Sequence, residues 1–274
     1  MAKVFSFLDA SPLSVDRFFS ELDNIPYEKG SDEFIEECAR LLSNLNSDPF
    51  LIRRHIEGHG GILSAISTFA SPQYFVLGRH HSKFGPIGLR VNFWLPISGG
   101  KFYAREKEMY SYELGHNHDF RFFTVGHFGP GYVTDLCEID PDGIAGIPGE
   151  HVDLMNRSTE QLTPGKVIYF DTFSDVHVQH PPDQMSVSIN LIIGVENWKR
   201  EQYEIDLTSS KLVGGVMQSP IGRTMACLDF ASYFADSETQ SLFGEFAKDK
   251  VFERVRTAAR GAIENSASFF GTAR

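Results

Sequence analysis

The chain has 274 residues, and its hydrophobic content of 42% is enough for a packed core, which argues against a disordered chain. Its formal net charge of -11 argues against a nucleic-acid binder or a protein attracted to anionic membranes. The sequence lacks a signal-peptide core and any run of about 20 apolar residues, so we expect a cytoplasmic protein without a membrane span. The three cysteines are widely separated and odd in number, which favours reduced thiols.

The first part of the chain, from about residue 11 to residue 68, has a helical pattern. The stretch SDEFIEECARLLSNL has apolar residues at spacings of three and four, and SVDRFFSELDNI starts with a capping residue. The stretch DPFLIRRHIEGHGG has a proline near its start and glycines at its end. Residues 1–70 are therefore predicted to form a helical extension packed on the next domain.

The middle of the chain, from about residue 73 to residue 195, has the pattern of many short strands. Turn residues separate these β-branched and aromatic runs, which favours an antiparallel barrel or sandwich over βαβ units. The predicted strands are QYFVLGRHH, IGLRVNFWLPI, KFYAREKEMYSYEL, FRFFTVGHF, YVTDLCEI, KVIYFDTF and MSVSINLIIGV. Residues 71–200 are predicted to form this β-domain.

The last part of the chain, residues 201–274, is predicted to form a second helical extension. Its helical stretches are TMACLDFASYFA, ETQSLFGEFAKD and KVFERVRTAARGAIENSASFF. Their apolar residues indicate burial, but a lid, a homodimer interface and a partner surface all remain open as explanations.

The stretch ELGHNHDFRFFTVGHFGPG contains three histidines within twelve positions. Side chains alternate across a strand, so His116 and His118 would point to the same side and could reach one metal ion. A third ligand would come from a neighbouring strand, and His177 follows the predicted strand KVIYFDTF. The alternative is a pair of ordinary core or rim imidazoles.

These two stretches together resemble the two motifs of the cupin superfamily. The first is Gly115 with His116 and His118, followed by a strand and the turn GHFGPG. The second is PGKVIYFDTFSDVH, which ends at His177, followed by SVSIN. The resemblance covers roughly residues 115–193. It implies a mainly β fold, a double-stranded β-helix (cupin or jelly-roll barrel), with N- and C-terminal α-helical additions.

The resemblance also has one departure, which concerns the metal ligands. Many cupins carry a glutamate ligand near the position of Phe122 or Phe123. The implied site is therefore three neutral histidines, as in the cupin thiol dioxygenases and related oxygenases. Fe(II) is the expected ion, and Zn, Mn, Ni or Cu are alternatives because imidazole suits all of them.

Two further histidines compete with the three chosen ones. His180 lies three residues after His177, but the family's distance from the Pro-Gly pair favours His177. His127 is expected in a hairpin turn, in a structural or solvent-facing role, unless the hairpin folds inward to make it a fourth ligand.

A substrate would bind inside the barrel, where four residues are candidates for its contacts. Arg90 and Asn92 share one face of a predicted strand, and Tyr103 lies on a face of the next. Phe122 has the same parity as the two histidines and would form an apolar wall. A buried arginine beside a metal would suggest a carboxylate or phosphate handle, whereas an arginine on the outer sheet surface is the alternative.

Three functional hypotheses follow. The first is a non-haem Fe(II) cupin oxygenase or dioxygenase that acts on a small organic substrate with O2; dependence on 2-oxoglutarate is a less favoured variant. The second is a redox-neutral metal cupin, an isomerase or lyase, and a tyrosine or glutamate beside the metal would favour it. The third is a non-catalytic cupin that binds a small ligand.

Overall fold

The computed structural model describes residues 1–60, 71, 73–97, 99–194, 201–215, 220–248 and 252–271. The chain forms two compact units. The first consists of Met1–Glu138 with Met155–Glu196, and the second consists of Ile139–Leu154 with Asn197–Arg274. The domain boundaries predicted at residues 70 and 200, and the last part of the predicted N-terminal helical zone, fall outside the described residues.

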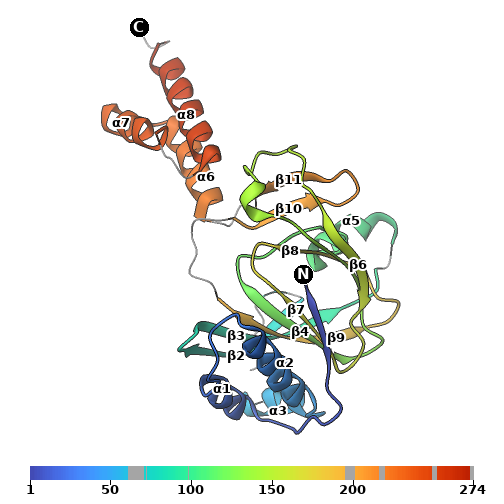
Figure 1. The fold of residues 1–274 in the computed structure, drawn as a ribbon. Helices are drawn as coiled ribbons and strands as arrows, with labels where there is room; N and C mark the ends of the chain where they lie inside the picture. The colour runs from blue at the N-terminus through green and yellow to red at the C-terminus, as the bar shows by residue number, and fades with distance from the viewer. Residues whose placement is uncertain are drawn as a thin grey trace. The chain divides into compact units, whose positions relative to one another are not determined.

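Three helices form the N-terminal layer of the first unit: α1 (Val15–Asp23), α2 (Asp32–Asn46) and α3 (Leu51–Gly58). Ser14 caps α1 and Ser31 caps α2, because each side chain accepts a hydrogen bond from a backbone N–H of the first turn. Figure 1 shows these helices in blue beside β2, β3 and β4, on one side of the larger sheet.

The larger sheet has six antiparallel strands in the order β1-β7-β4-β9-β3-β2. Its strands are β1 (Lys3–Ser6), β2 (Tyr74–Ser82), β3 (Gly85–Trp94), β4 (Arg121–Phe128), β7 (Lys166–Phe170) and β9 (Ser186–Ile193). The smaller sheet of this unit has the order β6-β5-β8, with strands β5 (Val133–Glu138), β6 (Met155–Gln161) and β8 (Asp175–Gln179).

The segment between β3 and β4 adds a fourth, irregular member to the smaller sheet, because Tyr112 and His116 bridge to β8 at Gln179 and His177. Along the chain, β3, this segment, β4 and β5 alternate between the two sheets. The β5–β6 hairpin stays in the smaller sheet, and β7, β8 and β9 then alternate again. This alternation is a jelly roll, so the predicted fold class is confirmed.

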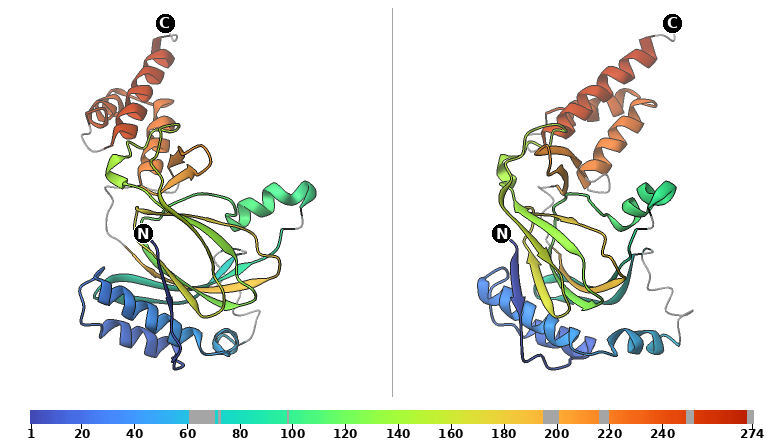
Figure 2. Two further views of the ribbon diagram at one scale, coloured as in Figure 1. Left: turned by 45° about the vertical axis from the view of Figure 1, so that its right-hand side comes forward. Right: turned by 90° about the vertical axis from the view of Figure 1, so that its right-hand side faces the viewer.

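The larger sheet separates two buried clusters. On its helix-covered face, odd-numbered residues of β3 such as Leu89 and Val91 pack with the N-terminal helices. On its other face, even-numbered residues such as Trp94 and Phe122 pack with residues of the smaller sheet, among them Leu136. The two views in Figure 2 show the helices on one side of this sheet and the smaller sheet on the other. We call the space between the two sheets the sandwich interior.

One predicted strand is wrong. The stretch KFYAREKEMYSYEL was predicted as a strand, but it forms a short 3-10 turn (Gly100–Phe102) followed by helix α5 (Tyr103–Tyr110). Its alternating aromatic residues suggested a strand, whereas Ala, Arg, Glu, Lys and Met in the same stretch are strong helix formers. The segment with His116 and His118 is also not a regular strand, since β4 begins only at Arg121.

The second unit contains a β-hairpin and three helices. The hairpin strands β10 (Tyr203–Asp206) and β11 (Lys211–Gly215) pair antiparallel. Helices α6 (Pro220–Ser232), α7 (Ser237–Phe246) and α8 (Glu253–Gly271) coincide with the predicted C-terminal helices and bury a cluster around Phe243. Among the described helices, none has the length and apolar character needed to cross a membrane.

Candidate metal centre

His116 is held in place by hydrogen bonds of its backbone and of its imidazole ring. Its backbone N–H donates to the carbonyl of His177, and its carbonyl accepts from the N–H of His177. Its Nδ1 lies 2.9 Å from the carbonyl oxygen of Leu114. Because a carbonyl can only accept, Nδ1 carries the proton and Nε2 is left with a free lone pair.

His118 lies two residues further along the same segment and is fixed from both sides. The Asn117 side chain donates to the carbonyl of Phe173, and the N–H of Phe173 donates to the carbonyl of His118. Asn117 is fully buried, and His118 is buried beside it. The alternation expected for a strand therefore holds in effect, since His116 and His118 both reach the site although the segment is irregular.

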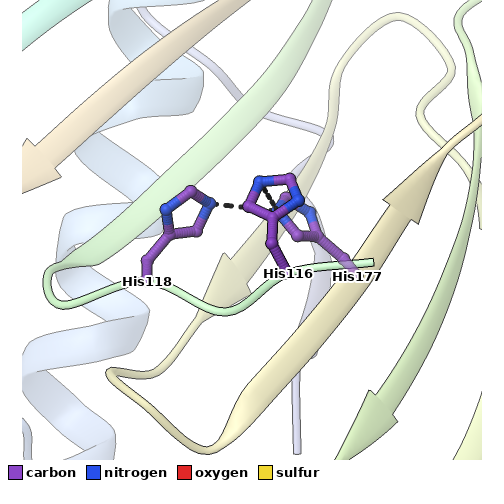
Figure 3. A group of neighbouring side chains, drawn as sticks. All are labelled: His116, His118 and His177. Atoms are coloured by element: carbon purple, nitrogen blue, oxygen red, sulfur yellow. Dashed lines mark hydrogen bonds between the residues drawn. The ribbon is translucent and has the colours of Figure 1, made fainter. Parts of the chain in front are cut away.

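His177 lies in the middle of β8, and its ring meets the other two. Its Nε2 is 3.0 Å from Nε2 of His118 and 3.2 Å from Nε2 of His116. The potential ligand atoms of the three residues all lie within 4.8 Å of one another. Figure 3 shows the three imidazoles pointing toward one another. The structure thus brings together the three histidines that the sequence analysis chose.

The spacing of these nitrogens fits a single divalent ion. Metal–nitrogen bonds of ~2.0–2.1 Å in a tetrahedral site place two ligand nitrogens roughly 3.3 Å apart. The two shorter nitrogen separations are close to that value. In the described part of the chain, the cluster contains no carboxylate and no thiol. The residues present therefore could hold a metal ion as a neutral three-nitrogen set.

The surroundings of the three imidazoles keep them unprotonated. Burial lowers the pKa of His116, His118 and His177 from its ordinary value, and it is the largest cause in each case. The positive charge of Arg90 lowers all three further. Neutral imidazole is the form that binds metals, so the site favours ligation without first having to lose protons.

Gln179 contacts the third histidine from the same strand. Its Nε2 is 2.9 Å from Nδ1 of His177, and its side chain is buried. In this orientation the amide donates to Nδ1, which places the ring proton on Nε2. If His177 binds a metal through Nε2, the Gln179 amide must be flipped by about 180°, so that its Oε1 accepts a hydrogen bond from Nδ1–H of His177.

Phenylalanine rings line one side of the three histidines. Phe120 stacks on His118 with ring centroids 4.6 Å apart, and Phe122 meets the same ring edge-on at 4.8 Å. Phe170 lies 4.6 Å from His177 and stacks on Phe122 at 4.4 Å. Phe122 therefore stands beside the histidines as an apolar wall.

The other three candidate substrate residues have different positions. Arg90 and Asn92 lie on the interior face of β3, the face that also carries Trp94. Tyr103 lies on α5, is 38% exposed, and donates a hydrogen bond to Glu113 at 2.9 Å. The structure thus brings Arg90 near the histidines, places Asn92 at the next interior position of β3, and places Tyr103 on the surface of a helix.

A hydrogen-bonded network also lines the sandwich interior. Thr124 donates to Oδ1 of Asn190 at 2.9 Å, and Ser188 donates to the same oxygen at 3.2 Å. Trp94 donates to Ser188 at 3.0 Å, and the buried hydroxyl of Tyr132 hydrogen-bonds with Thr124. This network was not predicted, although the polar residues at alternate positions of SVSINLII indicate a polar interior face.

Two other histidines lie apart from the cluster. His180 has its Nε2 2.7 Å from a carboxylate oxygen of Asp135. His127 belongs to β4, where a turn was expected, and its Nδ1 lies 2.9 Å from Oδ1 of Asn46 on α2. The strand continues through His127 to Phe128, and the connection that follows leads to β5 in the other sheet, so it is not the expected hairpin.

No family model matches the chain, and no curated protein matches it. A solved structure of the DMSP lyase DddQ from Ruegeria pomeroyi is similar, with 12% identity, 71% of this chain and 80% of that chain covered, and a TM-score of 0.27.

A structure of an oxalate decarboxylase is similar at 11% identity, with 50% of this chain covered and a TM-score of 0.27. The match spans only 29% of that structure's length. Likenesses this weak carry no argument about function. The assignment of a jelly roll with a buried three-histidine cluster follows from the strand order and the nitrogen distances of this chain itself.

Proposed function

We propose that the chain is a metal-dependent enzyme that performs redox-neutral chemistry, of the lyase or decarboxylase type, on a small organic substrate. In this proposal His116, His118 and His177 hold one divalent ion through their Nε2 atoms. Three neutral ligands would leave the double charge of the ion intact, so the ion would act as a Lewis acid toward an oxygen of the substrate. Fe, Zn, Mn, Ni and Cu are all compatible with three imidazoles.

The observation that carries this proposal is the hydroxyl of Tyr132 in the sandwich interior. Burial raises the pKa of Tyr132 overall, although Thr124 and Arg90 oppose the rise. The phenol therefore stays protonated, and it can donate its proton to a substrate in the same space. Elimination and decarboxylation each need such a transfer, because a proton leaves or joins the substrate carbon.

The charge of the interior supports the same reaction class. Among the described residues, the charged groups that act on the pKa of Arg90 are Tyr74 and Tyr132 and include no carboxylate, and Arg90 in turn lowers the pKa of all three histidines. A fixed positive charge stabilises the negative charge that develops on a substrate when a C–H or C–C bond breaks. Arg90 would thus lower the barrier without changing its own protonation.

The test compares turnover with and without oxygen. The protein is purified anaerobically, its metal is identified, and a panel of small organic acids is incubated with it in sealed vessels with and without air. We expect equal turnover in both, no O2 uptake, and retained turnover after replacement of the native ion by redox-inert zinc. Turnover that consumes O2 in proportion to product would overturn the redox-neutral proposal.

Tyr132→Phe tests the proton-transfer role. This variant removes the hydroxyl alone, and we expect kcat to fall by roughly 10²–10⁴-fold with unchanged metal content. Tyr110→Phe is the matched control, because Tyr110 is buried in the same cluster. Equal activity of the two variants would show that Tyr132 transfers no proton.

The Fe(II) oxygenase is the second candidate, and the phenylalanine wall favours it. Apolar rings lie against the imidazoles, and they belong to Phe120, Phe122 and Phe170. Such apolar surroundings would favour the binding of a small apolar molecule such as O2. This candidate requires iron as the native ion and O2 consumption, so the same experiment decides between the two.

A further inference from the structure

We propose that Arg90 and Asn92 form a carboxylate-binding subsite beside the three histidines, and that the substrate is a small hydroxycarboxylate. This inference rests on the proposed function, because it names the class of molecule that the same interior would take. The two residues would hold the acid end and the hydroxyl, and they would leave the rest of the molecule facing the imidazoles.

The register of the sheet places both side chains in the interior. Arg90 pairs with Asn190 on β9, and Asn92 pairs with Ser188 on the same strand. Residues paired across antiparallel strands share a face, and Ser188 and Asn190 belong to the network that Trp94 joins. Arg90 and Asn92 therefore stand side by side on the polar face of the larger sheet.

Each of the two residues has a buried polar atom with no partner in the described part of the chain. These atoms are Nε of Arg90 and Oδ1 of Asn92, and the Asn92 side chain is only 3% exposed. Buried polar groups in folded proteins nearly always have hydrogen-bond partners. Two unpartnered groups on adjacent interior positions of one strand are therefore best explained by a ligand that satisfies both.

The chemistry of the two atoms defines that ligand. The guanidinium of Arg90 can only donate, so it takes an acceptor, and its charge favours an anion. Oδ1 of Asn92 can only accept, so it takes a donor such as a hydroxyl. Alternate residues of a strand lie roughly 6.6 Å apart, which fits a compact acid with a hydroxyl a few bonds from its carboxylate.

A carboxylate fits better than a phosphate. Among the described residues, the buried polar ones include no lysine and no arginine, and the half-buried Arg90 is the arginine whose charge acts on all three histidines. Its guanidinium lies over the ring of Tyr74, with Cζ 5.1 Å from the ring centroid, which fixes its plane. A single planar guanidinium matches a planar, singly charged carboxylate through two parallel hydrogen bonds.

The experiment measures ligand binding by calorimetry, with zinc-loaded and with metal-free protein. The probes are hydroxycarboxylates of two to five carbons, propionate without a hydroxyl, methyl lactate without a charge, and inorganic phosphate. We expect at least one hydroxycarboxylate to bind more tightly than propionate, and methyl lactate to bind weakest. Binding of the ester as tightly as of lactate, preference for phosphate, or no binding of any hydroxycarboxylate would overturn the inference.

Variants assign the binding to the two residues. Arg90→Gln should weaken the best probe by roughly 10–100-fold, and Arg90→Lys by less, because it keeps the charge but loses the paired hydrogen bonds. Asn92→Leu should reduce the preference for the hydroxyl over propionate. Arg79→Gln is the control, because Arg79 is an exposed arginine on the neighbouring strand β2.

An affinity of Arg90→Gln and Arg90→Lys within about twofold of the wild type would assign the anion to another group. Metal content, measured on every sample, separates this inference from the proposed function. Metal bound without carboxylate binding would remove the subsite and leave the metal enzyme. Binding of a carboxylate by protein that never takes up a metal ion would keep the subsite and remove the metal enzyme.

Discussion

The two faces of the larger sheet are both buried, yet they have opposite chemistry. On β3, Leu89 and Val91 face the N-terminal helices, and both are 0% exposed. Arg90 and Asn92 alternate with them and face the sandwich interior. On β9 the same alternation sets Ile189, Leu191 and Ile193 against the interior residues Ser188 and Asn190.

The difference shows which face holds the fold together. Apolar burial on the helix-covered face stabilises the unit, because a large apolar area is removed from water and these side chains have no polar groups that lose hydrogen bonds to water. The interior face buries amides, hydroxyls and imidazoles, and this burial costs free energy wherever a partner is missing. A chain that keeps such a face does so for a reason other than stability, and local conflicts of this kind are expected at functional sites.

The largest effect should follow from removal of one of the three histidines. His116→Ala, His118→Ala and His177→Ala should each weaken metal binding by more than the roughly 10–100-fold that loss of an outer partner costs. Metal analysis after dialysis against a weak chelator measures the effect. His180→Ala should keep its ion, because His180 contacts Asp135 instead of the cluster. Full metal occupancy in all three alanine variants would show that the cluster is not a metal site.

Stability measurements on one strand would test the contrast between the two faces directly. Leu89→Ala should lower the free energy of unfolding by about 2–5 kcal/mol, because it leaves a cavity against the helices. Asn92→Leu should leave that free energy unchanged or raise it by up to about 1 kcal/mol, because it removes the unpartnered Oδ1. Urea unfolding followed by circular dichroism compares the two. A similar loss in both variants would make the interior face structural.

Much of the fold could be predicted from the sequence, because local patterns determine it. The three N-terminal helices, β2 to β5, β7 and β9 follow from apolar spacing and turn residues. Strand β6, with the sequence MNRSTEQ, could not be found in this way, because it is largely exposed and polar. Helix α5 was missed because its aromatic alternation outweighed its helix formers in the prediction.

The candidate site was predictable only in part. His116 and His118 are neighbours in sequence, and His177 was placed beside them through a family resemblance. Gln179 lies two positions after His177 on the same strand, so strand alternation was an available signal for it that was not used. Tyr132 could not be chosen, because it packs against Trp94 of β3, which is far from it in the sequence. Long-range pairing leaves no local pattern, so residues brought in by other strands emerge only from the structure.

Gln179 offers a smaller test of the interior face. Gln179→Leu removes the amide that contacts His177 and should weaken metal binding by roughly 10-fold, at the lower end of the 10–100-fold range for outer partners. Gln179→Glu should keep or strengthen binding, because a carboxylate accepts from Nδ1–H and leaves Nε2 free for the ion. Competition with a chelator measures both. Equal losses in the two variants would show that the contact does not orient the ring.

The smallest effect concerns a histidine on the other face. His127 contacts Asn46 of α2, and burial, the largest cause, lowers its pKa from the ordinary 6.5, although Asn46 and Asp48 raise it. In the unfolded chain the imidazole of His127 therefore becomes protonated near pH 6.5, whereas in the folded chain it stays neutral at that pH. The stabilising contribution of His127 is complete above that pH and is lost as the pH falls toward the folded-state pKa.

His127→Gln removes this titration and keeps a donor for the Asn46 side chain. We expect the unfolding free energy of the wild type to fall more steeply than that of the variant between about pH 7 and pH 5. The measurement uses metal-free protein, in which the three clustered imidazoles contribute equally to both proteins, so the difference between them isolates His127. Identical slopes would mean that His127 is solvated like an exposed imidazole. A steeper wild-type slope would show that this half-buried histidine on the helix-covered face contributes to the pH dependence of stability.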